Sequence, residues 1–219
     1  MTVLRIGHGG ASAVVRGNTL ESFDAALDIG VDMIEFDVRV QRGGLLLAHT
    51  KLHGVLLPCP TLDRALDHLS SRRFDGVELN LDLKDTACVE PTLAALERFG
   101  LKERALLSSQ CVAIVDRVRT LDPSVPTAIS VGGRVSRAVQ RWGAWRGRVL
   151  DALHRRRFDA LMAYHALIDA ALVEATHERG ADLYAWTVDD PSRIRSLTEL
   201  GVRGITTNDP RLFAASVVR

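Results

Sequence analysis

Two histidines stand at the ends of short runs rich in β-branched and aliphatic residues. His8 directly follows VLRIG (3–7), and His49 ends GLLLAH (44–49). Imidazole titrates near neutral pH, so a pair of histidines at neighbouring strand ends can serve as general acid and general base. Glycines around His8 let the backbone pass close to a bound anion, which predicts that Gly9 lies in a phosphate or substrate site.

Acidic side chains occupy the neighbouring runs. Glu35 and Asp37 lie two residues apart in DMIEFDV (32–38), so they share one face of a predicted strand. With Asp82 they would form an all-oxygen set suited to Mg²⁺ or Ca²⁺. Lys84 would then hold phosphate oxygens beside the metal. The alternative is that one carboxylate pairs with Lys84 and the other faces solvent.

These residues can form one site only if the fold brings the ends of the strands together, and the periodicity of apolar residues predicts such a fold. Strand-like runs alternate with helical patterns along the chain. The eight predicted strands are 3–7, 32–38, 77–83, 104–109, 126–131, 158–163, 182–188 and 203–207. The clearest helical stretches are 19–30, 61–71, 88–100 and 169–180, and 44–49 is expected to form a hairpin with the second strand.

Eight strand–helix units in 219 residues predict an α/β fold, a (β/α)₈ barrel formed by one domain over 1–219. In such a barrel the functional groups lie at the carboxyl ends of the strands. The rival, a doubly wound open sheet, usually carries a G-x-G-x-x-G loop after its first strand, and that loop is absent here.

Composition narrows the classes of function and location. Lys plus Arg is 28 against 27 Asp plus Glu, which argues against a nucleic-acid partner. Three widely spaced cysteines argue against a disulfide framework and favour a reducing compartment. The sequence has no apolar run of the ~20 residues that a membrane helix needs, and no signal peptide is recognised. We therefore expect a cytoplasmic protein, with its oligomeric state open.

Several motifs in order along the chain carry a family resemblance. They are IGHGGAS (6–12), NTLESFDAALDIGVDMIEFDV (18–38), LLLAH (45–49), PTLDRAL (60–66), LNLDLK (79–84), LYAWTVDDP (183–191) and GVRGITTNDP (201–210). With these motifs the sequence resembles the glycerophosphodiester phosphodiesterase family, a metal-dependent TIM-barrel group, and the related sphingomyelinase D-type phospholipases D.

The resemblance implies roles for individual residues. It implies that His8 and His49 are the acid–base pair, and that Glu35, Asp37 and Asp82 bind the metal. The same likeness implies that Lys84 lies near the phosphate and Trp186 on the pocket wall. It also implies that the reaction can pass through a cyclic phosphate, formed by a neighbouring hydroxyl of the substrate.

The sequence departs from the family pattern at four places. His8-Gly9-Gly10 stands where relatives usually have His-Arg-Gly, and Gly17 stands where they have Glu before Asn-Thr. Asp82 is more typical of the phospholipase D branch. About ten residues separate His49 from the next predicted helix, so the family's usual small insertion is missing. We expect a more open pocket as a result.

A basic segment, residues 134–157, contains eight arginines with Trp142 and Trp145. Its apolar residues recur at helical spacing, which favours an amphipathic helix packed on the barrel with a solvated basic face. Two alternatives stay open: peripheral contact with an anionic membrane, and an arginine that reaches the pocket in place of the missing one. Gly143 and Gly147 weaken a continuous helix.

Three hypotheses for function follow. The first is a metal-dependent phosphodiesterase that hydrolyses a small glycerophosphodiester or lysophospholipid-like substrate to an alcohol and a phosphomonoester. The second is a cyclising phospholipase D-like lyase, motivated by Asp82 and the C-terminal motif. The third is a barrel that binds a phosphorylated ligand without turnover, motivated by the losses at Gly9 and Gly17.

Overall fold

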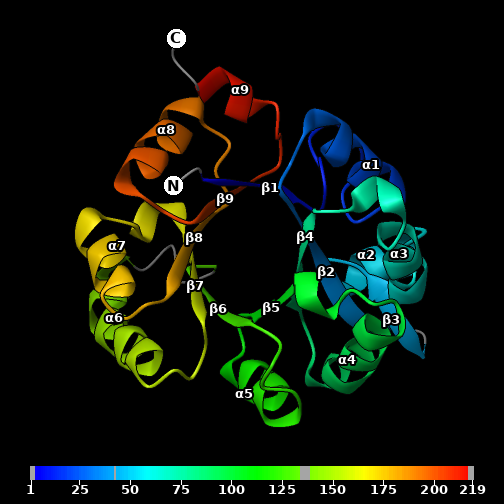
Figure 1. Cartoon of the computed structure of the whole chain (residues 1–219), viewed down its shortest axis with the longest axis horizontal. Helices are drawn as coiled ribbons and strands as arrows, with labels where there is room; N and C mark the ends of the chain where they lie inside the picture. Colours follow the sequence, from blue (N-terminus) through cyan, green and yellow to red (C-terminus); the bar gives the residue numbers. More distant parts are fainter. Residues whose placement is uncertain (1–2, 42, 134–138, 217–219) are drawn as a thin grey trace.

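Eight parallel strands close into a barrel with helices on its outside (Figure 1). The structure is a computed structural model that describes residues 3–41, 43–133 and 139–216. The sheet closes because β1 pairs in parallel with both β2 and β9. The barrel strands are β1 Leu4–His8, β2 Met33–Gln41, β4 Glu78–Leu83, β5 Ala105–Ser109, β6 Thr127–Val131, β7 Ala160–Tyr164, β8 Asp182–Trp186 and β9 Gly204–Thr207. The predicted (β/α)₈ barrel is confirmed, and each strand overlaps its predicted run.

The expected hairpin is also present. Strand β3, Gly44–Leu47, runs antiparallel to the end of β2, with Val38 opposite Leu47. A short helix that the periodicity did not predict, α2 Lys51–Leu56, follows it. Gly54 interrupts the pattern there and is a poor helix former, but a Cβ at this position would lie 2.0 Å from Oε1 of Gln41. The glycine that obscures the helix in the sequence thus packs against the end of the Gln41 side chain.

The remaining helices surround the barrel (Figure 1). They are α1 Leu20–Ile29, α3 Leu62–Leu69, α4 Val89–Arg98, α5 Val112–Leu121, α6 Val139–His154, α7 Ala170–His177, α8 Pro191–Leu200 and α9 Leu212–Ser216. Short 3₁₀ turns occupy Arg72–Phe74, Thr86–Cys88, Lys102–Arg104 and His165–Leu167. Thr19 caps the start of α1 by accepting from the Ser22 N–H, and left-handed Gly30 ends it. The loop between β1 and α1 follows the carboxyl end of β1 and ends at the Thr19 cap.

Apolar side chains fill the lower barrel and the layer between strands and helices. Ile6, Met33 and Tyr184 belong to the cluster inside the barrel, where all three are buried. The outer layer is represented by Phe23 of α1, whose ring centroid lies 5.3 Å from that of Phe36 of β2. The polar residues at the carboxyl ends of the strands thus stand on a rigid, apolar base.

The basic segment has two parts. Residues 134–138 and the side chain of Trp142 lie outside the described part of the chain. Within α6, Leu153 is buried and Val149 packs on the core, whereas Trp145 is 53% exposed under the guanidinium of Arg148. The expected amphipathic helix is thus present, and membrane contact stays a prediction. None of the helices in the described ranges is long and apolar enough to cross a bilayer.

Candidate active site

The strand register brings the predicted acidic residues to one level of the barrel. His8 of β1 lies opposite Glu35 of β2, and Asp37 of β2 lies opposite Asp82 of β4. One carboxylate oxygen from each of the three acids lies within 4.8 Å of the others. Two strands, β2 and β4, thus build a single acidic cluster, and His8 of β1 lies beside it.

Lys84 provides the nearest permanent positive charge. Its Nζ lies 2.6 Å from Oδ1 of Asp37 and 2.5 Å from Oδ2 of Asp82. Neither Glu35 nor Asp37 faces solvent, since both residues are buried. The alternative of one paired and one solvent-facing carboxylate is therefore wrong: a single lysine bridges two acids, and the third remains beside them.

Burial and neighbouring charges shift the pKa values of these groups in different directions. Burial, reinforced by the charges of Asp37 and Asp82, raises the pKa of Glu35 to about 7. Burial likewise raises the pKa of Asp82. Burial disfavours the ionised form of Asp37 too, but a hydrogen bond with His49 and the charge of Lys84 hold the pKa of Asp37 well below its usual range. The same two aspartates raise the pKa of Lys84 despite its burial.

The cluster fits a hard divalent cation. All three candidate ligands offer oxygen, the donor that Mg²⁺ and Ca²⁺ prefer. Oδ1 of Asp82 is buried without a hydrogen-bond partner. When all three carboxylates are ionised, the ammonium of Lys84 balances one of their charges and a protonated His49 balances a second, so at least one negative charge stays uncompensated. An orphaned oxygen and an unbalanced charge are the features that a bound divalent ion would correct.

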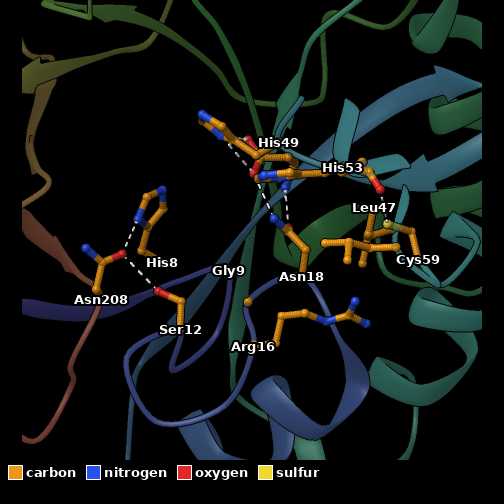
Figure 2. Close-up of a pocket in the computed structure, with 14 residues that line it drawn as sticks. His8, Gly9, Ser12, Arg16, Asn18, Leu47, His49, His53, Cys59 and Asn208 are labelled. Carbon is orange, nitrogen blue, oxygen red and sulfur yellow. Dashed lines mark hydrogen bonds and ion pairs between the residues drawn. The ribbon is translucent and has the colours of Figure 1, made fainter. Parts of the chain in front are cut away.

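His8 is oriented by an amide. Its Nδ1 lies 2.7 Å from Oδ1 of Asn208 (Figure 2). Nδ2 of Asn208 donates to Asp189 at 2.6 Å. Because the carboxylate of Asp189 can only accept, the amide must turn its oxygen toward His8, so Nδ1 of His8 is the donor. Nε2 of His8 then faces the cluster, 3.8 Å from Glu35.

His49 is oriented by a carboxylate. Its Nδ1 lies 3.2 Å from both oxygens of Asp37, and more than half of its side chain is exposed to the pocket. The hydrogen bond and the charge of Asp37 raise the pKa of His49. The two predicted acid–base residues therefore stand at one site on opposite sides of the acidic cluster, with different partners.

The loop between β1 and α1 supports the cluster from outside the barrel. Asn18 donates from Nδ2 to Asp37 at 2.8 Å and accepts the backbone N–H of Asp37 at 2.9 Å. It does so from a left-handed backbone with φ of 60°. Gly9, at φ of 57°, donates its N–H to Glu35 at 3.1 Å. The predicted phosphate glycine thus uses its amide on an acidic residue of the cluster.

Two adjoining cavities open at this level. The outer one, about 240 Å³, lies between the β1–α1 loop and the β3–α3 segment and includes Arg16, His53 and Leu57 in its wall (Figure 2). The inner one, about 90 Å³, reaches into the barrel past the acids to Trp186. Nε1 of Trp186 is buried without a partner. His8, Asp37 and His49 line both cavities.

An arginine does reach the outer cavity, but it is not from the basic segment. Arg16 lines that cavity, and its guanidinium donates to the carbonyl of Pro58 at 2.7 Å. Among the described arginines of the basic segment, Arg146 is paired with Asp169 instead. Arg134, Arg137 and the side chain of Arg141 lie outside the described residues.

Four polar residues of the site carry no role in the sequence prediction: Ser12, Asn18, Asp189 and Asn208. Asn208 follows the last predicted strand, so its place at the rim could be read from the sequence. Its contact with His8 joins residues 200 positions apart, and this contact could not be predicted from the sequence. Asn18 precedes a capping threonine, but its hold on Asp37 depends on a left-handed backbone that periodicity does not reveal.

Comparison with known proteins gives a consistent picture. The model of the "Glycerophosphoryl diester phosphodiesterase family" matches residues 8–68 and 57–212. The chain belongs to this family. Family membership assigns it to the phosphoric diester hydrolases.

Relatives match over nearly the whole chain. "Probable glycerophosphodiester phosphodiesterase 2" of Mycobacterium tuberculosis is 26% identical over 94% of this chain and 90% of its own. A glycerophosphodiester phosphodiesterase of Caldanaerobacter subterraneus is 24% identical over 96% of both. An Oleispira antarctica phosphodiesterase, solved with the product sn-glycerol-3-phosphate, superposes with a TM-score of 0.77 at 22% identity, over 98% of this chain and 96% of its own. The structural match supports the shared barrel.

Proposed function

We propose that this chain is a metal-dependent phosphodiesterase that hydrolyses a glycerophosphodiester to an alcohol and a phosphomonoester. The observation that carries the proposal is the placement of His8 and His49 on either side of one buried group of three carboxylates. The Oleispira relative was solved with sn-glycerol-3-phosphate, a phosphomonoester of the kind expected as product.

The acidic cluster would hold the cation. Glu35, Asp37 and Asp82 are its proposed ligands, and a bound Mg²⁺ or Ca²⁺ supplies positive charge to the phosphate oxygens as negative charge develops on them. Lys84, fixed by two aspartates, would add a second positive charge beside the phosphate. Trp186 would form the inner wall of the pocket. At Gly9 no side chain would stand between the backbone and the phosphate.

The two histidines would divide the proton transfers. A donating Nδ1 leaves Nε2 of neutral His8 as an acceptor, so we assign His8 as the base that takes a proton from the attacking water. His49 pairs with the carboxylate of Asp37, which favours its charged form, so we assign it as the acid that protonates the departing alcohol.

Cyclisation is the second candidate. It uses the same residues, but the nucleophile is a neighbouring hydroxyl of the substrate and the product is a cyclic phosphate. The observation that favours it is Asp82, which offers a shorter carboxylate than the family's usual glutamate at the third acidic position. Water need not enter if the cyclic product leaves first.

A metal-supplemented screen tests both candidates. Wild-type protein is incubated with glycerophosphocholine, glycerophosphoethanolamine and their acylated forms, with Mg²⁺, Ca²⁺ or a chelator, and products are resolved by phosphorus NMR. A monoester signal that needs the metal supports hydrolysis, and a persistent cyclic signal supports the lyase. Turnover that is unchanged by chelation would contradict the proposed metal site, and no turnover of any diester would contradict the proposed function.

A further inference from the structure

Helix α2 turns an apolar face toward solvent beside the active site. Of nine exposed large apolar side chains among the described residues, four lie within 52–57. Leu52, Val55 and Leu56 are 62%, 54% and 68% exposed, and their spacing places them on one face of the helix. Such a face normally packs on a protein core. Here the helix presents it outward, next to Leu57.

The opposite side of α2 is anchored to the barrel, which fixes this orientation. Gly54 is buried, and a Cβ at this position would meet the end of the Gln41 side chain. Nε2 of Gln41 donates to the carbonyl of Lys51 at 3.0 Å, and the hydroxyl of Thr50 caps the helix by accepting the His53 N–H. The polar contacts of the segment therefore lie on the barrel side, and its leucines have no place in the core.

The apolar face is continuous with the cavity that holds the two catalytic candidates. His53 and Leu57, from the same segment, line the outer cavity together with Leu47 and Ala48 of the hairpin (Figure 2). On the other side, Arg16 joins the β1–α1 loop to this segment through the Pro58 carbonyl. A path thus leads from the acidic cluster along an apolar wall to the exposed leucines.

The charges along this path suit an amphiphile whose polar end enters first. Residues 50–62 contain no acidic side chain. His53 and Arg16 line the cavity and place positive or ionisable groups there, while the exposed part of α2 is aliphatic. An anionic phosphodiester would lie at the cluster, with a hydrocarbon chain leaving across α2.

We infer that the face formed by Leu52, Val55, Leu56 and Leu57 binds the acyl chain of the substrate, which makes that substrate a single-chain glycerophospholipid. This inference rests on the proposed function and narrows its substrate class. Helix α2 follows the hairpin directly and Leu57 lines the cavity, so the chain can reach this face from the cavity.

A chain-length series tests the inference. Glycerophosphocholine and glycerophosphoethanolamine are assayed without an acyl chain and with hexanoyl, octanoyl and decanoyl chains, all below their critical micelle concentrations. Full burial of a methylene is worth about fourfold, so a one-sided surface should raise kcat/KM by about twofold per methylene, mainly through KM. From hexanoyl to decanoyl the gain should be on the order of tenfold.

Two variants locate the effect. Leu52→Gln/Leu56→Gln should reduce the hexanoyl-to-decanoyl gain to about threefold or less, and should leave the unacylated diesters unchanged, which also reports correct folding. Leu121→Gln is the matched control, because Leu121 of α5 is also exposed, at 41%, but lies outside both cavities. It should keep the full gain.

The outcomes separate this inference from the proposed function. Hydrolysis of the unacylated diesters with no gain on acylation would overturn the inference and leave the function standing. A gain that survives in the double variant would also overturn it. A change of oligomeric state in the double variant, without a change in chain-length dependence, would assign the face to a second copy of the chain. No hydrolysis of any member would overturn both proposals.

Discussion

The surroundings of His8 and of His49 differ in the kind of group that orients each ring. His8 hydrogen-bonds to the uncharged amide of Asn208, which in turn donates to Asp189. His49 leans on a buried carboxylate, Asp37, which Lys84 and Asn18 also contact. Both rings use Nδ1 for this contact, so both can present Nε2 to a substrate. The same side chain can thus serve as base on one side of the phosphate and as acid on the other.

The largest effects should come from removing the rings themselves. His8→Ala and His49→Ala should each lower kcat by roughly 10²–10⁴-fold, the usual contribution of a general acid or base. Phosphorus NMR of glycerophosphodiester turnover measures the loss. His68→Ala is the control, because His68 pairs with Asp24 away from both cavities. Near wild-type rates in both site variants would contradict the account.

A variant on the Asp37 side of the site should have a smaller effect on activity, and this effect should depend on the metal concentration. Asn18→Gly keeps the left-handed backbone accessible but removes the amide that positions Asp37. Outer contacts of this kind are worth about 10–100-fold in metal affinity or activity. We expect the metal concentration for half-maximal rate to rise by that factor, with most activity recovered at saturating metal. An unchanged metal dependence would show that Asn18 does not position Asp37.

The amide behind His8 should matter less, and without any change in metal dependence. Asn208→Ala removes one hydrogen bond to the ring, worth about 1 kcal/mol, or about fivefold in kcat. Ser12→Ala is the matched control, since Ser12 donates to the same oxygen of Asn208 and its removal leaves the hydrogen bond between Asn208 and His8 in place. If both variants behave alike, Asn208 does not orient His8 for catalysis.

The sequence predicted the elements well because the barrel repeats a strong local pattern. Each buried strand is a short apolar run, and its end carries the polar residue, so His8, Glu35, Asp37 and Asp82 could be placed together from topology alone. Helix α2 was not predicted because Gly54 is a poor helix former. Its contact with the side chain of Gln41 exists only in the folded chain.

The partners of the histidines could not be predicted, for a related physical reason. Asn208 meets His8 because β9 closes the barrel against β1, and a pairing between the two ends of a chain leaves no local trace. The bridging of two aspartates by Lys84 depends on register between strands. The sequence predicted which residues carry the chemistry, and the structure shows which groups contact each of them.

The most direct test of the divided proton transfers uses two leaving groups. Glycerophosphoethanolamine needs an acid to protonate its departing alcohol, whereas glycerophospho-p-nitrophenol releases a stable anion that does not. We expect His49→Ala to lose most activity on the first substrate but to stay within about tenfold of wild type on the second, and His8→Ala to be impaired on both. Equal losses for His49→Ala on the two substrates, or recovery of His8→Ala on the activated one, would contradict this expectation.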